Sequence, residues 1–139
     1  MPLIRQEFIR RDDLRQNRDR LYVFGDNYAQ SGAGGQAREC RGEPNAVGIP
    51  TKRTPSMDAA AFLTNEDLDE WRRRSFPAFN RLENALACGW TVVVPSDGVG
   101  TGLARLAQFA PAIDAEIKGR FDDLAQRYPL PATLPRSGA

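Results

Sequence analysis

The segment WTVVVPSDGVGTG, residues 90–102, contains the strongest strand signal in the chain. Residues 90–94 are apolar almost throughout, and such continuous apolar runs are typical of a central strand covered on both faces. Pro95 ends the run, and glycine then occupies every second position from Gly98 to Gly102. The segment therefore predicts a buried strand that opens into a flexible loop.

Strand, loop and helix follow one another in the same way on the amino-terminal side. Residues 21–24 form an apolar, aromatic and β-branched run that stops at Gly-Asp-Asn, residues 25–27, which is typical of a buried strand ending in a turn. The first glycine loop, residues 31–35, comes next and leads into a predicted helix over residues 36–40. Residues 46–49 then predict another short strand, closed by Pro50.

Two longer helices are predicted from apolar residues that recur at steps of three and four positions. The first begins near Glu66, where Thr64 and Asp67 form an imperfect capping box, and Pro77 is expected to kink this helix or divide it in two. The apolar faces consist of Leu68, Trp71, Ser75 or Phe76, Phe79, Leu82 and Leu86 in the first helix, and of Phe109, Ile113, Ile117, Phe121 and Leu124 in the second.

The alternation of strands and helices predicts the fold class. It favours an α/β fold in three layers, α/β/α, with a mainly parallel or mixed central sheet that places both glycine-rich loops at one edge. The length of 139 residues is sufficient for one domain, expected at residues 21–127. We expect residues 1–20 to form an N-terminal extension with a short helix near residues 12–16, and residues 128–139 to form a flexible proline-rich tail.

Composition excludes several kinds of chemistry. The chain contains no histidine, which removes Ser/His/Asp triads, Cys/His dyads and His-ligated zinc. Cys40 and Cys88 are too isolated for a disulfide framework or a thiolate metal site, and both are interpreted as small buried hydrophobic residues. We expect neither a metal nor a cofactor.

The net charge and the hydropathy of the chain indicate which partners and which cellular location to expect. The net charge of +1 provides no general attraction to nucleic acid or to a membrane surface. The longest apolar stretches are too short to cross a bilayer, and the charged residues 5–20 are unlike a secretory signal. We therefore expect a cytoplasmic protein without a membrane partner.

Few residue types remain that could perform chemistry. The second glycine loop, residues 96–102, can turn backbone N–H groups toward an anion, although its glycines could simply form a tight turn. Asp26 and Asn27 could hold ribose hydroxyls or position a water molecule, or could cap the strand as an Asx turn. Lys52 lies near the same edge, where it is either functional or an ordinary solvated lysine.

Three segments resemble parts of the macro domain, the module that binds ADP-ribose. Residues 92–95 and 98–102 resemble its strand, proline and phosphate-binding loop, and residues 31–37 are similar to its first glycine-rich loop. Residues 49–53 resemble the strand end that, in the lysine-dependent branch of the family, presents a lysine to the anomeric carbon of the sugar. The resemblance extends over residues 21–124.

The resemblance also implies roles for individual residues. Lys52 would attack the anomeric carbon, and Asp97 or Asp26 would act as acid or base. The position that matches the acidic residue of the lysine-dependent branch is Ala104, and no residue is assigned to adenine. The ligand-binding residues would be Asn27, Gly32, Ala33, Gly34, Gly35, Thr51, Ser96, Gly98, Val99, Gly100, Thr101, Gly102 and Leu103.

The function implied by this resemblance is binding of ADP-ribose or an ADP-ribosyl group, with hydrolysis of an ADP-ribosyl linkage as an additional activity. Its partner would then be ADP-ribose or an ADP-ribosylated substrate, and nucleic acid would be a partner only in ADP-ribosylated form. The alternative is a non-catalytic reader or sensor of a free nucleotide such as ADP-ribose or NAD. A third hypothesis is a structural or interaction protein whose glycine loops are only turns.

Overall fold

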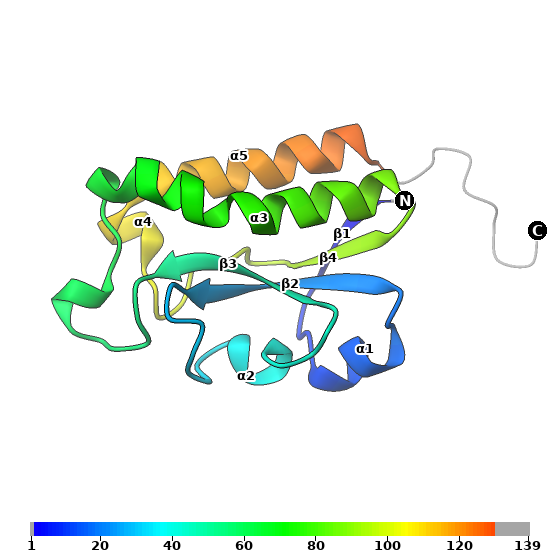
Figure 1. Cartoon of the computed structure of the whole chain (residues 1–139), viewed down its shortest axis with the longest axis horizontal. Helices are drawn as coiled ribbons and strands as arrows, with labels where there is room; N and C mark the ends of the chain where they lie inside the picture. Colours follow the sequence, from blue (N-terminus) through cyan, green and yellow to red (C-terminus); the bar gives the residue numbers. More distant parts are fainter. Residues whose placement is uncertain (1, 130–139) are drawn as a thin grey trace, which may run out of the picture.

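The computed structural model describes residues 2–129 and has an α/β fold built on a four-stranded sheet (Figure 1). The strands lie in the order β1-β4-β2-β3, and each neighbouring pair is parallel. All four strands therefore end at the same edge of the sheet. The strands are β1 (Leu3–Gln6), β2 (Arg20–Asn27), β3 (Ala46–Lys52) and β4 (Thr91–Pro95).

The predicted central strand is β4, which pairs with β1 on one side and with β2 on the other. Val92, Val93 and Val94 are completely buried, as a strand covered on both faces requires. This confirms the interpretation of the apolar run at residues 90–94, except that Trp90 lies outside the strand and is exposed.

The amino-terminal segment is part of the sheet. Leu3 in β1 is buried against the core, and Ile9 and Leu14 are buried on the opposite face. The domain therefore begins before residue 21, where we expected its boundary. The apolar alternation in this segment is weak because β1 is a short edge strand that contains exposed Arg5.

Helices cover both faces of the sheet, which gives the three layers that the sequence predicts (Figure 1). The helices α3 and α5 lie side by side on one face, and α1 and α2 lie on the other. The helix α1 agrees with the short helix expected near residues 12–16. The helices are α1 (Arg11–Gln16), α2 (Ala37–Cys40), α3 (Leu68–Ala87), α4 (Leu106–Phe109) and α5 (Pro111–Arg127), with the 3-10 helices η1 (Ala59–Ala61) and η2 (Asn65–Asp67).

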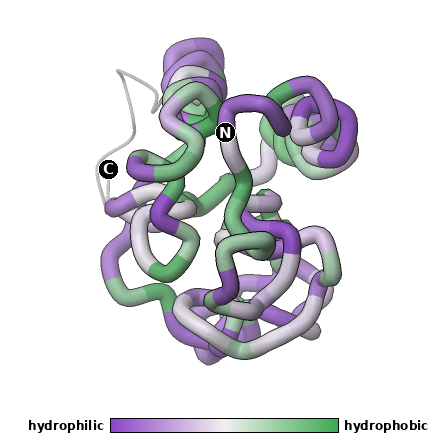
Figure 2. The backbone as a smooth tube through the Cα atoms, turned by 90° about the vertical axis from the view of Figure 1, so that its left-hand side faces the viewer, coloured by the Kyte–Doolittle hydropathy of each residue, from purple (hydrophilic) through white to green (hydrophobic). Residues whose placement is uncertain are grey.

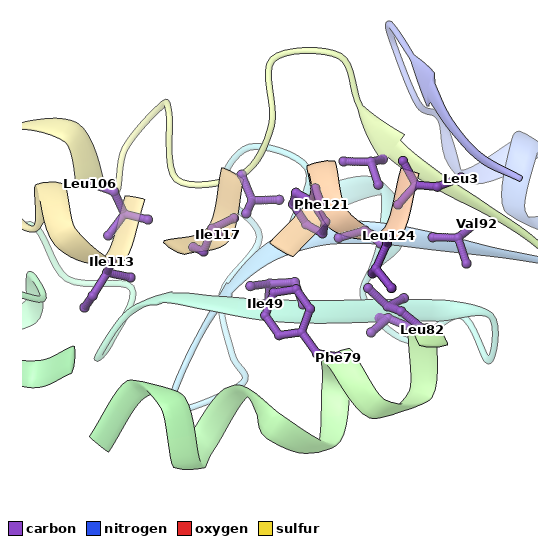
Figure 3. Close-up of a cluster of buried hydrophobic side chains, with 14 of the residues drawn as sticks. Leu3, Ile49, Phe79, Leu82, Val92, Leu106, Ile113, Ile117, Phe121 and Leu124 are labelled. Carbon is purple, nitrogen blue, oxygen red and sulfur yellow. The ribbon is translucent and has the colours of Figure 1, made fainter. Parts of the chain in front are cut away.

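The larger core lies between the sheet and the helices α3 and α5. Phe79 of α3 packs against Phe121 of α5 with ring centroids 5.8 Å apart, and both rings lie near Ile49 of β3 (Figure 3). In Figure 2 the hydrophobic positions of these two helices face inward. A smaller cluster on the other face consists of Ile9, Leu14, Tyr22, Phe24, Ala37, Cys40 and Val93.

Two prolines lie inside continuous elements, although the sequence predicts that they interrupt or end them. The helix α3 continues through Pro77 as one helix, because buried Ser75 and Phe79 hold it to the core on both sides of the proline. The strand β3 continues through Pro50 to Lys52, because β3 is an edge strand and can accommodate a residue that lacks an N–H donor.

The structure confirms the predicted capping interaction between Thr64 and Asp67 at the start of the long helix. Residues 65–67 form the 3-10 turn η2 that leads into α3, and the Asp67 carboxylate accepts a hydrogen bond from the Thr64 N–H at 2.8 Å. In the second helix the predicted apolar face is divided, since Phe109 belongs to the separate turn α4 and the other four residues belong to α5.

The two cysteines differ in a way that alkylation can test. Cys40 is fully buried, and this burial raises the pKa of its thiol to about 12, whereas Cys88 is exposed at the end of α3, contrary to our expectation. Because only the thiolate reacts, iodoacetamide is expected to modify Cys88 alone in the folded protein and both cysteines in denaturant. Peptide mass mapping would measure this, and modification of Cys40 at the rate of Cys88 in the folded protein would contradict it.

Candidate functional site

A cleft with a volume of about 320 Å³ lies at the carboxyl edge of the sheet. The ends of β2 and β3 form part of it, and the first and second glycine loops form most of the rest. This volume is in the range of small-molecule sites, and the position is where ligands bind in parallel α/β folds.

Most of the predicted site residues line this cleft together. The exceptions are Ala33, Ser96 and Asp97. The residues that line it are Asp26, Asn27, Gly32, Gly34, Gly35, Thr51, Lys52, Gly98, Val99, Gly100, Thr101, Gly102 and Leu103.

Ser96 and Asp97 line a separate, smaller hollow. This hollow lies between β1 and the middle of α5 and also includes Arg5 and Lys118. The chain turns back after Asp97, where the Gly98 N–H donates to the Pro95 carbonyl at 2.8 Å, so the second glycine loop enters the cleft only from Gly98 onward. The structure thus places Asp97 and Ser96 outside the cleft that the other predicted site residues line.

The two glycine loops approach each other at the mouth of the cleft. A Cβ atom at Gly34 would lie 3.1 Å from Cδ1 of Leu103, so a side chain in the first loop would press on the residue that follows the second. Deeper in the cleft, a Cβ atom at Gly25 would lie 3.6 Å from the Gly100 nitrogen and 3.5 Å from Oγ1 of Thr51. The glycines thus allow β2, β3 and both loops to meet around one space.

Asp26 is held by Arg41, a residue that sequence reasoning missed. The Arg41 guanidinium donates to Asp26 Oδ1 at 2.6 Å, to the Gly32 carbonyl at 2.7 Å and to the Ser31 carbonyl at 3.1 Å. The Asn27 N–H also donates to Asp26 Oδ1, at 2.8 Å. These bonds make Asp26 an anchor for the first glycine loop rather than a free proton acceptor.

Asn27 and Thr51 also hold backbone. The Asn27 side chain is buried and donates from Nδ2 to the Ser31 carbonyl at 2.8 Å, which closes the turn before the first glycine loop. The Thr51 hydroxyl donates to the Asp26 carbonyl at 3.0 Å and joins β3 to β2. The Asn27 side chain therefore bonds to a residue four positions on and does not form the Asx turn predicted as its alternative role.

Lys52 is buried, not solvated. Its side chain is only 6% exposed, and its ammonium donates to the Ser56 carbonyl at 2.6 Å and lies 4.7 Å from the centroid of the Phe62 ring. Within residues 2–129 it forms no ion pair. Burial, together with the charge of Arg105, lowers the pKa of Lys52 below its ordinary value of 10.5.

Several lining residues were not predicted. Gln36 falls inside the segment that is similar to the macro-domain loop, so this resemblance could have identified it. Arg41 follows α2 and contacts Asp26 across 15 positions of sequence, and no local pattern indicates such a contact. The others are Gly25, Ser31, Ala37, Pro55 and Ala104.

Two further searches of the described residues concern metals and membranes. Residues 2–129 hold no group of three or more His, Cys, Asp or Glu side chains that could bind a metal ion. In the same part of the chain, none of the helices combines the length and apolar character needed to cross a bilayer.

Comparison with known proteins gives one match. A protein-family model matches residues 4–120, and its description is a family of unknown function, DUF7831. No curated protein and no solved structure matches the chain.

Proposed function

The chain belongs to the DUF7831 family, a family of unknown function, and we propose that it is a divergent macro domain whose cleft binds ADP-ribose or an ADP-ribosyl group. The observation that supports this proposal best is the meeting of two glycine-rich loops around one cleft at the carboxyl edge of a parallel sheet. If both loops were only turns, nothing would require them to line one cleft.

The charge and backbone of the cleft suit a diphosphate. Lys52 and Arg41 line it together with a single acidic residue among the described residues, Asp26, whose charge Arg41 balances. Gly98 and Gly100 both have φ near +80°, a left-handed conformation that lets a loop turn backbone N–H groups toward an anion, and the Gly98 N–H itself is bound to the Pro95 carbonyl. Such N–H groups and cations are the usual partners of phosphate oxygens.

Gly102 offers the sharpest test of this proposal. A Cβ atom there would meet no atom within 4 Å, and Gly102 lines the cleft, so a leucine would fill ligand space without disturbing the fold. We expect Gly102→Leu to weaken ADP-ribose binding at least about tenfold, or about 1.4 kcal/mol. Calorimetric titration would measure it, with AMP and ribose 5-phosphate as reference ligands.

The matched control is Gly119→Leu, which adds the same side chain at an exposed, equally open position in α5. This variant should bind ADP-ribose like the unmodified protein. Absence of ADP-ribose binding to the unmodified protein would refute the proposal, and unchanged binding by Gly102→Leu would move the ligand out of this cleft.

A second candidate function, hydrolysis of an ADP-ribosyl linkage, is favoured by the state of Lys52. A lysine must lose its proton to act as a nucleophile, and burial of Lys52 lowers its pKa and so increases the uncharged fraction. Nζ would form a bond to the anomeric carbon while the bond to the acceptor breaks, and the acceptor would leave with the electron pair and take the proton that the alkylated Nζ gives up. Water would then release ADP-ribose from the lysine.

Hydrolysis makes a separate prediction. Lys52→Met should slow release of ADP-ribose from an ADP-ribosylated protein or nucleic acid by about 100-fold or more, because the nucleophile is lost. In the unmodified protein the rate should rise with pH with its midpoint below pH 10.5, since the pKa of Lys52 is lowered from that value. Chromatographic quantification of released ADP-ribose would measure both effects, and tight binding without any release would favour the non-catalytic reader.

A further inference from the structure

One polar atom in the wall of the cleft lacks a partner. Gln36 lies at the start of α2 and lines the cleft, and its Oε1 atom is buried without a hydrogen bond to any described residue. A buried acceptor without a donor costs folding free energy, because the water that it would bind in the unfolded chain is not replaced. Because Oε1 is shielded from solvent while Gln36 borders the cleft, a turn of this side chain toward the cleft would let a ligand supply the missing donor.

The place of Gln36 in the fold separates it from Lys52. The Lys52 ammonium lies over Phe62, and the Phe62 ring packs at 4.7 Å from Phe109 of α4, on the side of the sheet where α4 and α5 lie. Gln36 precedes α2, which covers the opposite face (Figure 1). The two side chains therefore line different ends of the cleft.

Gln36 is also held in place before any ligand arrives. The Cys40 N–H donates to the Gln36 carbonyl at 3.1 Å, and Ala37 and Cys40 are buried in the smaller hydrophobic cluster. On the other side of Gln36, Arg41 binds the carbonyl of Gly32. The backbone around Gln36 is therefore fixed, and only its side chain has to turn to meet a ligand, which limits the conformational freedom lost on binding.

We propose that Gln36 Oε1 accepts a hydrogen bond from the adenosine half of the ligand and makes the cleft selective for that half. This inference rests on the proposed binding of ADP-ribose, with the distal ribose at the Lys52 end. The adenosine half offers donors of two kinds, the exocyclic amino group of adenine and the hydroxyls of its ribose. Either group would supply the hydrogen-bond donor that Oε1 of Gln36 lacks.

The test combines one variant with two altered ligands. Gln36→Leu keeps the size of the side chain and removes the acceptor, and it is expected to bind ADP-ribose about tenfold more weakly. The unmodified protein should also discriminate by about tenfold against one of two analogues, the hypoxanthine analogue without the amino group or the 2′-deoxy analogue of the adenosine ribose. Gln36→Leu should lose that discrimination, and the analogue affected identifies the donor.

A stability measurement separates this role from a structural one. Because Oε1 holds nothing in the fold, the melting temperature of Gln36→Leu should not fall below that of the unmodified protein. Gln126→Leu, the same change on an exposed position of α5, serves as the matched control for binding. Equal ADP-ribose affinity in Gln36→Leu and the unmodified protein would overturn this inference alone, whereas absence of ADP-ribose binding to the unmodified protein would overturn the proposed function and this inference with it.

Discussion

Replacing Gly100 with valine is expected to lower the free energy of unfolding by about 3–5 kcal/mol, through backbone strain and overpacking together. Gly100 has a φ of +80°, which β-branched residues rarely adopt. Its added Cβ atom would also lie 2.7 Å from Cγ of Leu106, a fully buried residue whose N–H donates to the Gly100 carbonyl at 3.0 Å. Neither the loop nor the core beneath it can move without loss.

Urea denaturation would measure this effect, and Gly98→Val separates its two causes. Gly98 has the same φ of +80° but no atom within 4 Å of an added Cβ, so this variant carries the strain alone and should lose only about 1–2 kcal/mol. Equal losses in the two variants would show that the contact with Leu106 contributes nothing. Loss of ligand binding in a Gly100 variant would therefore not locate the ligand, which is why Gly102 is the better probe of the cleft.

Trp71→Ala is expected to lower the free energy of unfolding by about 3–5 kcal/mol, the usual range for removing a large aromatic residue from a core. Trp71 is completely buried, and its ring packs edge-on against Phe79 at 6.1 Å. Its indole N–H donates to the Pro50 carbonyl at 2.7 Å, so the variant also leaves a buried acceptor without a donor near the end of β3.

The matched variant is Trp71→Phe, which keeps most of the packing and removes the hydrogen bond. It should lose about 1–2 kcal/mol in the same denaturation experiment. A loss below about 1 kcal/mol for Trp71→Ala would contradict the packing of the core between α3 and the sheet, since truncation of a buried large side chain to alanine costs at least about 2 kcal/mol.

The parts of the fold that the sequence predicts are those determined by local chemistry. A continuous apolar run such as residues 91–94 is sufficient to identify the buried central strand. The turn at Thr64 and Asp67 is likewise encoded by side chains three positions apart. The strand β1 has no such local signal, because four residues that include Arg5 become a strand only through pairing with β4.

The candidate site likewise has a part that local sequence predicts and a part that it does not. Glycine-rich loops after predicted strands can be recognised locally, and the parallel topology then brings them to one edge. Local sequence does not show which residues of a loop face the cleft. Asp97, next to Gly98 in sequence, lies outside the cleft, whereas Arg41 lines it. The burial of Lys52 depends on the packing of residues 56–62 over its side chain, which no pattern at residues 49–53 indicates.

The strand order also has a consequence for synthesis of the chain on the ribosome. Since β4 lies between β1 and β2, these two early strands cannot join into one sheet until residues 91–95 have emerged. Until then, β1 has no strand to pair with and β2 has one open edge, and unpaired edges are sites where nascent chains aggregate. The most hydrophobic strand is thus also the last to be made, so the complete sheet forms late and in a single step that depends on contacts distant in sequence.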